Sequence, residues 1–170
     1  MTGPADPVAP RVIVVGIGST YRRDDGAGAA VAEEVARACP GVTRLGPVAE
    51  PLDLLGLWDG ADLVVVTDAV RSGAEPGTVQ IVELWDGDGA GAGAGAGAGS
   101  GGPSGTTSTH GIGLAGVLRL ARAVGSAPRR VVVVGIEGED FGNGTGLSAT
   151  VERAVGHAAD HVRELVDPAR

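Results

Sequence analysis

The chain of 170 residues alternates between short apolar runs and longer stretches with apolar residues at helical spacing. Short valine-rich runs bounded by glycine or turn residues predict buried strands at 12–15, 42–50, 62–70, 78–85 and 129–137. Apolar residues three and four positions apart predict helices at 27–38, 52–58, 110–124 and 148–166. This alternation predicts an α/β fold, a three-layer αβα arrangement with a twisted, mostly parallel central sheet of about five strands.

A tract of alternating glycine and alanine interrupts the pattern at about residues 87–105. Glycine destabilises both helix and strand, because it enlarges the unfolded ensemble. We therefore expect a flexible Gly/Ala-rich loop inside a single domain that spans residues 1–170. Two roles remain open for the tract. It could close over a ligand as a lid, or it could be a neutral expansion of a tolerant surface loop.

Composition narrows the classes of partner. The chain is 43% hydrophobic but only 2% aromatic, which is typical of a buried sheet built from aliphatic residues. Its net charge of −8 disfavours nucleic acid as a partner, since no basic stripe is available to displace counterions. No apolar run reaches the roughly 18 residues of a membrane span, and the N-terminus lacks signal-peptide features. We expect a monomeric, cytoplasmic protein with no membrane partner.

Candidate ligands follow the predicted strands, where open α/β sheets bind ligands. Asp24 and Asp25 follow the first strand, Asp68 ends the third, and His110 opens the helix after the glycine–alanine tract. Carboxylate and imidazole groups suit a divalent metal such as zinc or nickel, with positions left open for water or substrate. The alternatives are helix capping by Asp24 and Asp25 and hydrogen bonding of Asp68 to loop amides.

Other chemistries have weaker support. Gly16-x-Gly18 resembles the start of a dinucleotide-binding loop, but Tyr21 stands at the third glycine position. The two aspartates that follow would also repel a pyrophosphate. His157 and His161 lie one helical turn apart and could share a metal, but the acidic residues of that helix favour a solvated face. The chain lacks the G-x-S-x-G motif of a serine nucleophile.

Three segments, VGIGSTYRRDDGAG, VVVTDAV and STHGIGLAGVL, resemble the signature regions of hydrogenase maturation proteases. The sequence AEPGT after the third strand adds to the likeness, which extends from Val12 through the final helix. The resemblance implies an aspartyl endopeptidase-like hydrolase. Such enzymes remove the C-terminal extension of the nickel-iron hydrogenase large-subunit precursor after nickel has been inserted.

The resemblance also implies that Asp25, Asp68 and His110 contact the metal and carry the catalysis. We expect Asp24 to be a structural neighbour that caps the helix or supports the loop. Family members have glutamate or aspartate at the position of Asp25. Nickel is expected to come with the substrate, and zinc or cadmium could occupy the same ligands. Two other classes remain open: a non-catalytic nickel-binding maturation chaperone that uses these ligands, and a nucleotide-binding regulator on a Rossmann-like sheet.

Overall fold

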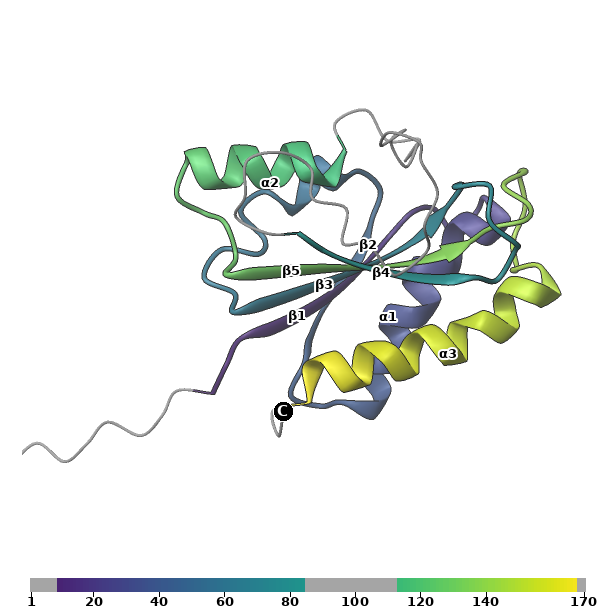
Figure 1. Ribbon diagram of the computed structural model, residues 1–170, viewed down its shortest axis with the longest axis horizontal. Coiled ribbons are helices and arrows are strands. Elements are labelled where there is room, and N and C mark those ends of the chain that lie inside the picture. The colour runs from purple at the N-terminus through teal and green to yellow at the C-terminus, as the bar shows by residue number, and fades with distance from the viewer. Residues whose placement is uncertain (1–8, 85–112, 168–170) are drawn as a thin grey trace, which may run out of the picture.

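A mixed sheet forms the centre of the fold in the computed structural model, which describes residues 9–84 and 113–167 (Figure 1). Its strands are β1 (Val12–Ile17), β2 (Thr43–Val48), β3 (Leu63–Val70), β4 (Val79–Leu84) and β5 (Arg130–Glu137). Their order across the sheet is β2-β1-β3-β5-β4. The pairings among β2, β1, β3 and β5 are parallel, and β4 runs antiparallel to β5.

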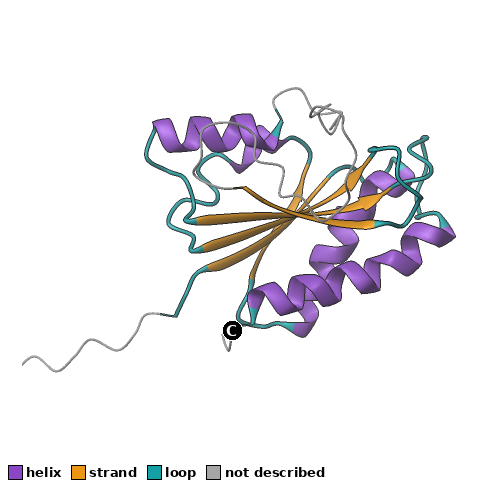
Figure 2. Cartoon of the chain, in the orientation of Figure 1, coloured by secondary structure: helices purple, strands orange, loops and turns teal. Residues whose placement is uncertain are grey.

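Helices cover both faces of this sheet (Figure 2). The helices α1 (Ala27–Ala38) and α3 (Ala149–Val166) pack on one face, and α2 (Leu114–Ala123) lies on the other with the 3-10 turn η2 (Pro51–Leu54). Alternate residues of each strand point to opposite faces, so Val14 contacts the α1–α3 layer while Val15 contacts the α2 layer. The predicted three-layer α/β fold is confirmed.

Most predicted elements are present at nearly their expected bounds, but two helices differ. The segment 52–58 is a 3-10 turn rather than a helix, because the backbone becomes extended at Leu55. Helix α2 begins at Leu114 with Gly113 as its N-cap, four residues after His110. Ser148 caps α3 as predicted, since its Oγ accepts a hydrogen bond from Val151 N at 3.4 Å.

Some sequence-based expectations fall outside the described residues. These expectations concern His110 and the Gly/Ala-rich tract at about 87–105, which both lie outside the described ranges. The extent of a single domain over 1–170 stays a prediction. None of the helices in the described part of the chain is long and apolar enough to cross a membrane.

Close backbone packing sets α1 against the carboxyl ends of the central strands. A Cβ atom at Gly28 would lie 2.3 Å from the carbonyl oxygen of Thr67, so only glycine fits there. The Thr67 hydroxyl donates to the Gly28 carbonyl at 2.7 Å and lies 3.2 Å from the Val15 carbonyl. The loop between β1 and α1 is thereby held above the ends of β1 and β3.

Candidate metal-binding site

Asp25 lies in this loop, within a 3-10 turn formed by Arg23–Gly26. Its side chain and backbone are buried, with only 3% of the residue exposed. Asp25 Oδ2 accepts a hydrogen bond from Ser19 N at 2.8 Å. Gly18 has a φ of 114°, and a Cβ atom there would lie 2.1 Å from the Asp25 carbonyl oxygen. The loop therefore folds back tightly on itself and fixes the Asp25 carboxylate.

Asp68 lies on the adjacent strand β3, opposite Gly135 of β5. Its Oδ1 atom is buried and has no hydrogen-bond partner among the residues that the structure describes. The pKa of Asp68 is raised to about 7, mainly by burial and also by the negative charge of Asp25, against the lowering effect of a hydrogen bond from the Ala69 backbone. The structure thus brings Asp25 and Asp68 within electrostatic range of each other.

These two carboxylates fit a divalent cation. A buried carboxylate oxygen without a partner is rare, because its desolvation is left uncompensated. A cation beside Asp25 and Asp68 would supply the missing contact and offset their mutual repulsion. The described residues contain no cluster of three or more histidine, cysteine or acidic side chains that could hold a metal. His110, the third predicted ligand, lies outside them, so its role stays a prediction.

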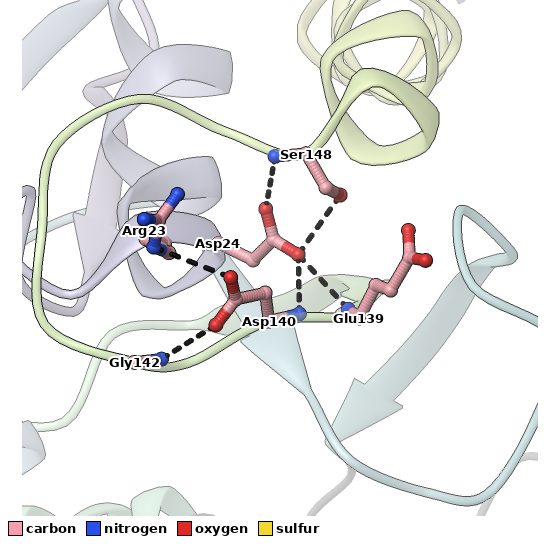
Figure 3. A network of polar contacts seen from close by, with 6 residues as sticks. All are labelled: Arg23, Asp24, Glu139, Asp140, Gly142 and Ser148. Atoms are coloured by element: carbon pink, nitrogen blue, oxygen red, sulfur yellow. Dashed lines mark hydrogen bonds and ion pairs between the residues drawn. The ribbon is translucent and has the colours of Figure 1, made fainter.

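Asp24 has a different environment from its neighbour Asp25, and Figure 3 shows the network of polar contacts around Asp24. It is fully buried, and its Oδ2 accepts from Glu139 N at 2.9 Å, Asp140 N at 2.8 Å and Ser148 Oγ at 2.9 Å. Its Oδ1 accepts from Ser148 N at 2.6 Å. Burial alone would raise the pKa of Asp24, but these hydrogen bonds outweigh it and the pKa lies below its ordinary value. Asp24 therefore holds the 139–148 loop.

This result settles the two alternatives for Asp24. The expected support of a loop is confirmed. Capping of α1 is not, because the N-cap of that helix is Gly26 and no side chain caps it. The remaining two histidines, His157 and His161, are exposed on α3, as the solvated-face interpretation predicted.

Comparison with known proteins identifies the family of the chain. The family described as HycI, hydrogenase maturation protease, matches residues 103–164. The hydrogenase expression/formation protein HupD of Rhodobacter capsulatus is 32% identical over 163 residues, which cover 91% of this chain and 71% of that protein. The chain belongs to the hydrogenase maturation protease family.

Other hydrogenase maturation proteases are also similar to this chain in sequence and in fold. The hydrogenase 2 maturation protease of Escherichia coli K12 is 28% identical over 156 residues, which cover 89% of this chain and 88% of that protein. The solved structure of the E. coli hydrogenase maturating endopeptidase HybD has the same fold, with a TM-score of 0.71 and 24% identity over 92% of this chain and 91% of that one. The chain spans 58% to 74% of the length of the HupD and HoxM relatives.

Glu137 is a buried acidic residue of this family member that the sequence did not single out. It ends β5 and is only 4% exposed. Its carboxylate accepts from Ser72 N at 2.9 Å, Ser72 Oγ at 2.6 Å and Gly73 N at 3.0 Å. Burial opposes ionisation, but these hydrogen bonds hold the pKa of Glu137 below its usual value. Glu137 thus anchors the turn that follows β3, a few residues beyond Asp68.

Proposed function

We propose that the protein is an endopeptidase that removes the C-terminal extension of a nickel-iron hydrogenase large-subunit precursor after nickel insertion. Membership of the maturation protease family supports this function. The observation that carries it is the buried Asp68 Oδ1, which has no partner among the described residues and lies near the Asp25 carboxylate. Such a pair is suited to a cation that arrives with the substrate.

Asp25, Asp68 and His110 would hold the nickel ion, and zinc or cadmium could occupy the same ligands. A bound divalent ion polarises a peptide carbonyl and lowers the pKa of water. The role of the chain itself is to hold the ligand side chains in position. The Ser19 N–H group fixes Asp25 Oδ2, and the parallel neighbours β1 and β5 hold Asp68 on β3. Fixed ligands of this kind orient the scissile peptide relative to the reactive groups.

The precursor is the partner that this function requires. We infer that the enzyme works as a monomer in the cytoplasm and binds the precursor transiently. Its net charge of −8 and its aromatic content of 2% support a protein that binds neither nucleic acid nor a permanent partner.

Intact-mass measurement of the precursor tests the proposal. A nickel-loaded precursor and a nickel-free precursor from the same organism are each incubated with the protein. Loss of a C-terminal peptide from the nickel-loaded form alone is expected. An unchanged mass of a precursor shown to be nickel-replete would contradict the endopeptidase. Stoichiometric binding without a mass change would instead support the non-catalytic nickel chaperone.

A further inference from the structure

A groove of about 410 Å³ opens next to the loop that carries Asp25. Gly26, Ala29 and Ala30 line it from the start of α1, and Pro47 lines it from β2. The side chains of Arg23 and Arg44, which also line it, are 46% and 36% exposed. We call this feature the arginine-rimmed groove. Its small apolar residues leave space for a side chain, and its guanidinium groups offer charged donors.

The segment beside the groove presents an aromatic ring to solvent. Tyr21 is 75% exposed, the most exposed of the large hydrophobic side chains in the described ranges. Its backbone is fixed, because its carbonyl accepts from Gly144 N at 2.9 Å and Arg23 N donates to the Gly144 carbonyl at 3.0 Å. A rigid backbone with an outward aromatic side chain loses little conformational entropy when a partner covers it.

The cations around the groove are only weakly engaged. Arg23 Nε lies 3.2 Å from Asp140 Oδ2, and Arg44 lies 3.4 Å from Glu33 Oε2. Ion pairs this exposed contribute little, so a ligand can replace them. Arg22 is exposed, and its guanidinium forms no ion pair with any residue in the described ranges. Arg23 and Arg44 line the groove together with one carboxylate, that of Glu33, and Arg22 adjoins Arg23 in the chain. Guanidinium groups therefore outnumber carboxylates in the lining, although the net charge of the chain is −8.

We propose that Tyr21, Arg22 and the arginine-rimmed groove form the docking surface for the protein substrate. The substrate presents an acidic segment that pairs with the arginines, and one of its apolar side chains enters the groove. Tyrosine and arginine are the residues enriched where a few contacts dominate binding energy. Docking here places the adjoining substrate segment beside Asp25. This inference rests on the proposed function, because it assigns a surface to the precursor.

Steady-state cleavage of the nickel-loaded precursor by Tyr21→Ala and Arg22→Glu tests the surface. Each substitution is expected to raise KM about tenfold, with kcat at saturation within about twofold of wild type. The Arg22→Glu variant is also expected to lose part of the salt dependence of kcat/KM, because that dependence reports charge steering. Arg129→Glu, at the residue before β5 and so at the amino ends of the parallel strands, away from the groove, is the matched control and should leave both constants unchanged.

The outcomes separate this inference from the proposed function. If wild type cleaves nothing, the proposed function is wrong. If wild type cleaves and both variants retain its KM, the docking surface is wrong. A fall in kcat at unchanged KM would also overturn the inference, since it would place these side chains in the reaction rather than in binding. Thermal melting of each variant, compared with wild type, confirms that it is folded during the assay.

Discussion

Two carboxylates on neighbouring segments, the fully buried Asp24 and the half-buried Asp68, have opposite surroundings. Asp24 accepts four hydrogen bonds from the 139–148 loop, and these lower its pKa. Asp68 has a buried Oδ1 without a partner among the described residues, and burial raises its pKa to about 7. Both carboxylates lose water contacts on folding, so the difference between them lies in the hydrogen-bond donors that the protein provides to replace that water.

The comparison separates structural from functional carboxylates. A satisfied carboxylate such as Asp24 contributes to stability, because donors of the protein itself engage both of its oxygens. An unsatisfied one such as Asp68 costs stability, and folded proteins keep such groups at functional sites. By this criterion we propose Asp68 as a residue of the working site, together with Asp25, whose charge acts on it, while Asp24 and Glu137 belong to its frame. Substitutions at each carboxylate test this division.

Asp25→Asn is expected to produce the largest effect, a loss of cleavage rate of about 10³-fold or more, because an amide is a poor metal ligand. Asp25→Glu keeps the carboxylate and is expected to retain cleavage within about tenfold of wild type. Single-turnover cleavage of the nickel-loaded precursor measures both. Equal activity of the asparagine and glutamate variants would show that the charge at this position is not needed.

Asp24→Ala is expected to lower the free energy of unfolding by about 3 kcal/mol, because it leaves buried donors of the 139–148 loop without an acceptor. Ser148→Ala removes one donor to Asp24 and the N-cap of α3, so we expect a smaller loss of about 1 kcal/mol. Urea denaturation followed by circular dichroism measures both. A loss at Asp24 no larger than the loss at Ser148 would contradict the structural role of Asp24.

The pH dependence of stability should differ between the two sites. The folded-state pKa of Asp68 is raised to about 7. Its contribution to the free energy of unfolding is therefore fully present below the unfolded pKa of about 3.8 and is lost as the pH rises towards 7. Asp24 has a lowered pKa, so its contribution is present above about 3.8 and is lost as the pH falls below that value.

Asp68→Asn isolates the first of these contributions. From pH 4 to pH 8, the free energy of unfolding of the variant should rise relative to that of wild type by about 1–2 kcal/mol. Urea titrations of both proteins at each pH measure this difference. A difference that stays constant with pH would refute the raised pKa of Asp68.

Glu137→Gln should produce the smallest effect in this series. The amide keeps an acceptor oxygen for the Ser72 and Gly73 donors but loses the charge that strengthens those bonds, so the expected destabilisation is about 1 kcal/mol. Thermal unfolding measures it, with His157→Ala on the exposed face of α3 as a control that should be neutral. A Glu137→Gln protein as stable as the control would show that the turn after β3 does not depend on the carboxylate.

The sequence predicted the sheet and part of the site for identifiable reasons. Valine runs mark the buried strands, and the rule that ligands bind beyond the carboxyl ends of strands placed Asp25 and Asp68 together. The partners of Asp24 could not be predicted, because the Ser148 bonds join residues 124 positions apart. Glu137 was missed for the same reason, since Ser72 lies 65 positions away. The segment 52–58 has helical spacing, but its backbone leaves the helical region at Leu55.

The central claim is that the Asp25–Asp68 pair acts in cleavage while Asp24 and its loop only support it. Intact-mass measurement of the nickel-loaded precursor, with Asp68→Asn and Ser148→Ala side by side at a temperature where both are folded, tests this most directly. The account predicts that Ser148→Ala releases the C-terminal peptide as wild type does and that Asp68→Asn leaves the precursor intact. Release of the peptide by Asp68→Asn at the wild-type rate would contradict it.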